Sequence, residues 1–150
     1  MRTTYRVLAY LIAALVAVQS AVMVFAIAGL IKWVDDGGVL DSAALESEES
    51  MFSEDFGFAI HAVSGMYLIP LIALVLLIVS FFAKVPRGVM WAVSVFGLVV
   101  VQVLFGLFGF AAPVFGLLHG LNALVLFTVA LVAARNARSP APETAQPVAA

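Results

Sequence analysis

The two histidines are the residues of this chain best suited to chemistry in apolar surroundings. The chain contains no cysteine, and its only histidines, His61 and His119, both lie inside long apolar runs. An imidazole can ligate a metal, relay a proton or hydrogen-bond to a neighbouring helix. Because an unpaired polar group in hydrocarbon is costly, an intramembrane histidine is by default a candidate functional residue. What the two rings can do depends on the elements that carry them.

The composition is that of an integral membrane protein. Of the 150 residues, 65% are hydrophobic and 11% are charged, whereas soluble domains carry about 25% charged residues. Irregular backbone cannot face lipid, so we expect each long apolar run to be a helix. The first run exceeds the roughly 7–15 residues of a signal-peptide core, so we expect it to be retained. Four runs reach the roughly 20 residues needed to span a bilayer: about 7–31, 56–82, 89–110 and 114–134.

The placement of charge predicts how the chain crosses the membrane. Six of the seven basic residues fall on one side if the chain crosses four times, and the positive-inside rule makes that side the cytoplasm. The loop at 34–55 carries eight of the nine acidic residues and is expected outside, solvated and partly helical. We therefore expect a multi-pass protein of the cell membrane with both termini cytoplasmic. Residues 136–150 are rich in Pro and Ala and are expected to form a disordered cytoplasmic tail.

Short connections predict an all-α fold, an antiparallel up-down four-helix transmembrane bundle that forms a single domain over residues 1–135. The second and fourth helices would then face each other diagonally. His61 and His119 each lie about five residues into their runs, or roughly 8 Å below the outer end. The two rings should therefore share one depth in the outer half of the bilayer. No internal repeat is evident, and no basic aromatic patch suggests nucleic acid as a partner.

Small and polar residues share helix faces with both histidines. Positions three or four apart lie on the same face of a helix. The glycines among them leave room for a flat cofactor, although tight packing of small residues between helices explains them equally well. The polar members are candidates for hydrogen bonds that orient the imidazoles. The residues expected around a shared cofactor are Ser64, Gly65, Gln102, Gly106, Gly116 and Asn122.

The number of protein ligands favours haem over other metal groups. Zinc sites require three or four protein ligands, and no acid lies within the body of a helix. A haem supplies four nitrogens to its iron and needs only axial ligands, so His61 and His119 suffice. We therefore expect non-covalent haem b, whose propionates would face outward, where Lys32 is the only basic residue. Interhelical hydrogen bonding, a proton role and a non-haem metal role are the alternatives for the two histidines.

With these residues in view, the chain resembles one half of the haem A synthase family. The stretch QVLFG, residues 102–106, is similar to the family's third-helix motif Q-x-x-L-G, and His61 and His119 match the ligand positions on its second and fourth helices. The resemblance covers about residues 5–135. It implies a four-helix membrane bundle with a haem between two histidines, and half-length members imply a homodimer.

Two departures from the family pattern limit what the resemblance implies about activity. Phe58 stands where the family has the glutamate of its E-x-x-H-R motif, and Ala62 stands where it has the arginine. No catalytic residue is therefore assigned, and oxidoreductase activity is left open. We expect a small membrane b-type cytochrome for transmembrane or quinol-linked electron transfer, with quinol or another redox protein as partner. The alternatives are a non-enzymatic accessory or scaffold subunit of a membrane complex, and a homodimeric haem-handling or haem-modifying protein.

Overall fold

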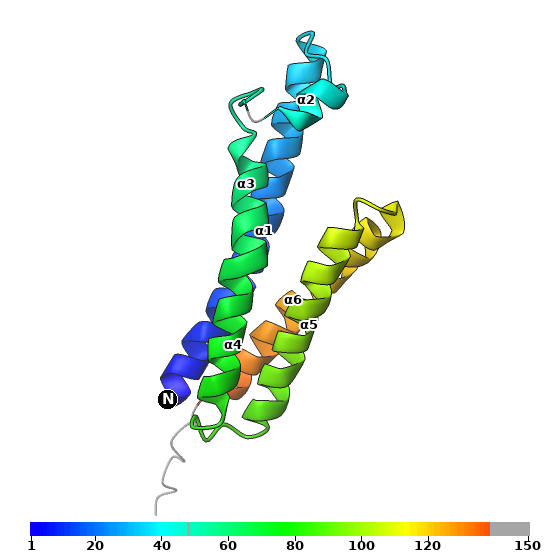
Figure 1. Ribbon diagram of the computed structural model, residues 1–150. Coiled ribbons are helices and arrows are strands. Elements are labelled where there is room, and N and C mark those ends of the chain that lie inside the picture. The colour runs from blue at the N-terminus through cyan, green and yellow to red at the C-terminus, as the bar shows by residue number, and fades with distance from the viewer. Residues whose placement is uncertain (48, 139–150) are drawn as a thin grey trace, which may run out of the picture.

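The computed structural model describes residues 1–47 and 49–138, and that part of the chain is helical without strands. The helices α3, η1 and α4 are continuous and form one long helix, Phe56–Ser80. From residue 139 onward, the tail expected to be disordered lies outside the described residues. The elements are α1 (Arg2–Asp35), α2 (Ser42–Glu46), α3 (Phe56–Val63), η1 (Ser64–Leu68), α4 (Ile69–Ser80), α5 (Gly88–Phe108) and α6 (Pro113–Asn136) (Figure 1).

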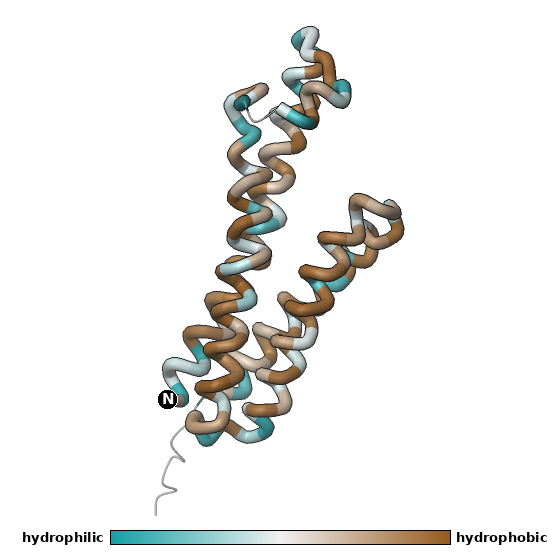
Figure 2. Tube along the Cα trace, viewed as in Figure 1, coloured by the Kyte–Doolittle hydropathy of each residue, from teal (hydrophilic) through white to brown (hydrophobic). Residues whose placement is uncertain are grey.

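Within residues 1–47 and 49–138, four helices are long and apolar enough to cross a membrane, as predicted. They are α1, the helix Phe56–Ser80, α5 and α6, with 34, 25, 21 and 24 residues. At 1.5 Å per residue, even the shortest reaches roughly the 30 Å thickness of a bilayer core. Apolar residues follow these helices along most of their length, while polar residues gather at the ends and in the loops (Figure 2). The protein is therefore a multi-pass membrane protein.

A proline explains why the helix Phe56–Ser80 contains a π-turn. Pro70 has no N–H to donate, and its ring presses on the carbonyl four residues earlier. Over η1 the hydrogen-bond ladder widens, so that Ile69 N–H donates to the Ser64 carbonyl, five residues back. The Ser64 hydroxyl also donates to the Ile60 carbonyl, a contact that tends to bend helices. One extra residue thereby enters the helix shortly after His61.

The helices pack in a ring that leaves α4 and α6 diagonally opposed. α1 packs against both α4 and α6, and α5 packs against the same two helices. The second and fourth membrane helices are therefore the diagonal pair, as the short connections predict. The upper segment α3 continues along α1. Gly57 permits this close approach, because a Cβ there would lie 2.9 Å from the Val22 carbonyl oxygen.

Side-chain packing is concentrated at the end of the bundle that holds the N-terminus and the 81–87 loop, here called the packed half. Toward the other end the two helical pairs diverge (Figure 1); this end contains both histidines and is called the histidine half. Alanines let the helix backbones approach closely in the packed half. Its buried side chains include Tyr5, Ala9, Ile12 and Val16 of α1, Ala73 and Leu76 of α4, Ala92, Val95 and Val99 of α5, and Leu126, Ala130, Ala133 and Ala134 of α6.

Polar contacts close the packed half at its end. The Tyr5 hydroxyl, fully buried, donates to the Gly88 carbonyl at 3.0 Å. Arg138 Nη2 donates to the Tyr10 hydroxyl at 3.2 Å. These bonds join α1 to the start of α5 and to the segment after α6. The two helical pairs are thus fixed to each other at one end and diverge from there.

Enlarging a buried alanine should destabilise the packed half. Ala130 is fully buried, so Ala130→Leu forces its neighbours apart, at a cost of about 1–3 kcal/mol. We expect a lower midpoint of thermal unfolding in detergent, followed by helical circular dichroism. Thr128→Leu, two residues earlier at an exposed position of α6, is the matched control. An unchanged midpoint for Ala130→Leu would contradict this account of the packing.

Candidate functional site

The two histidines meet between the diagonal helices. His61 on α3 and His119 on α6 have ring centroids 6.0 Å apart, with their planes inclined by 55°. Both residues are half-buried. Two imidazoles on opposite sides of one metal ion, each bound at about 2.0 Å, have centroids roughly 6 Å apart. The separation of the rings therefore matches that of two axial ligands.

Each histidine bonds through Nδ1 to a backbone carbonyl of the neighbouring helix. His61 Nδ1 lies 3.2 Å from the carbonyl oxygen of Gln19 on α1. His119 Nδ1 lies 2.9 Å from the carbonyl oxygen of Gln102 on α5. When Nδ1–H donates to these carbonyls, Nε2 keeps its lone pair, which is the state of a metal-ligating histidine. Both rings thus make interhelical hydrogen bonds, one of the predicted alternatives, and still retain a nitrogen for a ligand.

A closed set of hydrogen bonds surrounds the backbone of His119. Gln102 Nε2 donates to the His119 carbonyl at 3.0 Å. Asn122 Nδ2 donates to Gln102 Oε1 at 2.6 Å and to the Leu98 carbonyl at 3.0 Å. Gln102 and Asn122, both expected beside His119, therefore hold α5 and α6 in register. Their side chains act on the backbone and on each other, while the imidazole itself bonds to a carbonyl.

Gln19 makes corresponding contacts around His61, although the sequence pattern does not single it out. Its side chain bonds to Ser64 Oγ. In the opposite amide orientation, Nε2 would donate to the His61 carbonyl at 3.2 Å and to His61 Nδ1 at 2.6 Å, and Oε1 would accept from Gly65 N–H at 3.1 Å. Nδ1 is then an acceptor, so Nδ1–H donates to the Gln19 carbonyl only while the amide nitrogen bonds to Ser64 Oγ. Gln19 therefore contacts this histidine through its carbonyl and Ser64 of the same helix through its side chain. The available sequence signal is that Gln19 is the one amide in its apolar run.

The three predicted glycines differ in what surrounds them. A Cβ at Gly106 would lie 3.2 Å from Cε1 and 3.3 Å from Nδ1 of His119, so this glycine lies directly against the ring. A Cβ at Gly65 would meet the Gln19 amide at 3.8 Å, an ordinary contact. Around Gly116 there is nothing within 4 Å. Only Gly106 is therefore required by the position of an imidazole.

Aromatic residues pack together at the end of the first helical pair in the histidine half. Phe58, at the position of the family's glutamate, packs edge-on against Phe52 with centroids 6.3 Å apart. Phe52 in turn lies 6.1 Å from the Trp33 ring. The position that would carry the family's carboxylate is therefore part of an apolar contact with the acidic loop.

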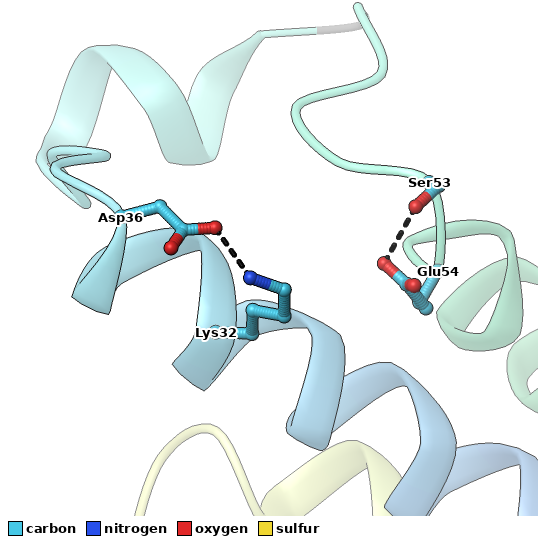
Figure 3. A network of polar contacts seen from close by, with 4 residues as sticks. All are labelled: Lys32, Asp36, Ser53 and Glu54. Atoms are coloured by element: carbon cyan, nitrogen blue, oxygen red, sulfur yellow. Dashed lines mark hydrogen bonds and ion pairs between the residues drawn. The ribbon is translucent and has the colours of Figure 1, made fainter.

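The ammonium of Lys32 is already paired with a carboxylate. Its Nζ lies 2.7 Å from Asp36 Oδ2, and both side chains are largely exposed. On the facing segment, the Ser53 hydroxyl donates to Glu54 Oε2 at 2.8 Å (Figure 3). Lys32 thus belongs to an exposed ion pair at the end of α1, where screening by solvent makes such pairs weak.

The histidines are not part of a larger cluster of metal-binding side chains. Within residues 1–47 and 49–138, no group of three or more His, Cys, Asp or Glu is placed to hold a metal ion. No family model, curated protein or solved structure matches this chain. The fold and site define a helical multi-pass membrane protein with a histidine pair between its diagonal helices. The resemblance to half of a haem A synthase stays a prediction from sequence.

Filling the space at Gly106 should displace the His119 ring. In Gly106→Leu the added side chain occupies the position of the imidazole, which must leave the Gln102 carbonyl. The chain has two histidines, so ¹⁵N nuclear magnetic resonance of selectively labelled protein gives two sets of ring signals. We expect the His119 set to change markedly. Gly97→Leu, on the same helix in open space, is the control. Equal spectra for the two variants would contradict the contact between Gly106 and His119.

Proposed function

We propose that this protein is a small membrane cytochrome that holds one haem b, with His61 and His119 as axial ligands. The observation that carries the proposal is the pairing of the chain's only two histidines across the bundle, with ring centroids 6.0 Å apart. Each Nδ1 has its own carbonyl partner, which leaves Nε2 for iron.

The donor set fits haem better than it fits a bare metal ion. A haem brings four nitrogens and takes two axial ligands, whereas zinc takes at least three protein ligands. Within the described residues, no further His, Cys, Asp or Glu joins the two histidines. The space at Gly106 is taken by the His119 ring, so this glycine serves the position of the proposed ligand. Tight packing is concentrated in the other half of the bundle, which supports a bound group in the histidine half.

The proposed orientation places the packed half toward the cytoplasm, with the helices alternating in direction. Arg2 and Lys84 meet there, since Arg2 Nη2 donates to the Lys84 carbonyl at 3.3 Å. Arg135 and Arg138 lie at the end of α6 and just after it. The acidic residues that the structure describes between 36 and 47 and between 49 and 55 lie at the opposite end (Figure 1). This distribution of basic residues supports an arrangement with both termini inside, which puts the histidine half in the outer leaflet.

The proposed chemistry is electron transfer from one side of the membrane. Bound haem would supply one-electron chemistry, and two protein axial ligands leave no open position for oxygen. The Gln19 and Gln102 carbonyls would hold the Nδ1 protons and make both imidazoles better donors to iron. Since both histidines are used at one depth, the chain has no pair for a second haem in the packed half. Exchange with quinol or an external redox protein is therefore favoured over transfer across the whole membrane.

Haem binding is tested on the full chain purified in detergent after expression with haem supplied. We expect a sharp reduced α-band in the wild type, and its loss in both His61→Ala and His119→Ala. Ser20→Ala, at an exposed position of α1, should keep the spectrum. A folded wild-type protein that takes up no haem would refute the proposal and leave the accessory-subunit alternative. Recovery of haem A or an oxidised intermediate would instead support a haem-modifying role.

Orientation is tested with single cysteines, because the chain has none of its own. Ser42→Cys in α2 should react with a membrane-impermeant maleimide added to intact cells. Lys84→Cys should react only after the cells are permeabilised. Both positions are exposed, so a difference in labelling reports sidedness. The reverse labelling pattern would place the histidine half in the inner leaflet and contradict the proposed topology.

A further inference from the structure

The four membrane helices form two hairpins that are built alike. The first hairpin is α1 with the helix Phe56–Ser80, and the second is α5 with α6. Four buried positions of α1, and the half-buried or buried glutamine after them, recur on α5 at the same spacing, 83 residues later, the separation of Tyr5 and Gly88. The corresponding pairs are Tyr5 and Gly88, Ala9 and Ala92, Ile12 and Val95, Val16 and Val99, and Gln19 and Gln102.

The second helix of each hairpin also repeats, once the π-turn is taken into account. The buried positions Ile69, Ala73, Leu76 and Ser80 have the same spacing as Leu126, Ala130, Ala133 and Ala137. From His61 to Ile69 is one residue more than from His119 to Leu126. The π-turn η1 lies in that interval and absorbs the extra residue. Each histidine therefore precedes a helical segment with the same spacing of buried residues, and the π-turn brings the two histidines to equivalent positions relative to those segments.

Exchanging the two hairpins reproduces the packing of the bundle. α1 contacts α4 within its hairpin and α6 across the bundle, while α5 contacts α6 within its hairpin and α4 across it. This pattern is that of an approximate two-fold axis through the centre of the bundle. The two histidines, which meet at 6.0 Å, lie on either side of that axis.

The hydrogen bonds at the histidines follow the same symmetry. In each hairpin, a glutamine carbonyl on the first helix faces Nδ1 of the histidine on the second. Each glutamine amide also bonds to the helix that carries the histidine and contacts the polar residue three positions after it. That residue is Ser64 in the first hairpin and Asn122 in the second.

We propose that Gln19 and Gln102 are equivalent positioning residues, one in each hairpin, that orient His61 and His119 as ligands. This inference rests on the proposed haem site. In each case the side-chain amide bonds to the helix that carries the histidine, at Ser64 Oγ or at the His119 carbonyl, and the backbone carbonyl of the same glutamine meets Nδ1. A leucine of similar size keeps the helix but removes the amide. In hydrocarbon no water replaces the lost bonds, so the two helices lose their fixed register.

The expected effect on haem follows from the Nδ1 hydrogen bond. A carbonyl that accepts from Nδ1–H makes the imidazole more basic. A more basic ligand stabilises ferric iron, so weakening the bond raises the reduction potential. Because the two hairpins are equivalent, loss of either glutamine should shift the potential in the same direction. A role confined to helix packing would leave the potential and the ferric spectrum unchanged in whatever haem is still bound.

The test compares Gln19→Leu and Gln102→Leu in the full chain, loaded with haem in detergent. We expect about 10-fold weaker haem binding in each variant, a raised reduction potential, and a shifted low-spin signal in electron paramagnetic resonance of the ferric form. Ser20→Leu introduces the same side chain at the exposed neighbouring position and should leave all three unchanged. Ser64→Ala and Asn122→Ala remove one glutamine partner each and should give smaller shifts of the same sign.

The outcomes separate this inference from the proposed function. A wild type that binds haem, with both Gln variants identical to Ser20→Leu, overturns the positioning role and leaves the cytochrome standing. A response from only one glutamine overturns the equivalence of the hairpins. A wild type without haem overturns the proposed function and this inference together. If the leucine variants do not fold, unchanged potentials in Ser64→Ala and Asn122→Ala overturn the positioning role.

Discussion

The need to satisfy two imidazoles within an apolar layer constrains everything else around them. A helical carbonyl already accepts one hydrogen bond from its own helix and has a second lone pair to offer. The histidines use this spare capacity on Gln19 and Gln102. Such a bond forms only where two helices lie very close. Gly57 allows that approach between α3 and α1, where a Cβ would be 2.9 Å from a carbonyl oxygen.

The two halves of the bundle differ in their packing. Alanines and interlocking aliphatic side chains give the packed half a continuous core, and the Tyr5 and Arg138 bonds close its end. In the histidine half, α3 packs along α1 and α5 packs along α6, and the two pairs meet at the histidines. The positions of the rings are therefore set largely by helices whose core lies in the packed half.

The sequence was sufficient to predict the membrane helices and the meeting of the histidines, because both depend on hydropathy and on position along a helix. The diagonal pairing followed from short connections. Gln19 was not predictable in the same way, since the face that α1 turns toward α3 is decided by packing. Pro70 is a cause of the π-turn that the sequence shows. Predictions from helical spacing assume a regular pattern of hydrogen bonds, however, so they do not tell where an inserted residue lies. Gly116 shares a face with His119 in sequence, yet spacing does not reveal that nothing stands opposite it.

The loop at 81–87 connects the two hairpins that we propose to be equivalent. Each hairpin carries one histidine and the glutamine that contacts it, so the hydrogen bonds of each imidazole form within its own hairpin. Apart from Ala83 and Val85, which join the core, the loop acts as a tether that raises the effective concentration of one hairpin near the other. Geometrically, the membrane domain is equivalent to a dimer of hairpins fused into one chain. In such a single chain the two halves need not be identical in sequence, and Ser64 and Asn122 occupy the corresponding positions.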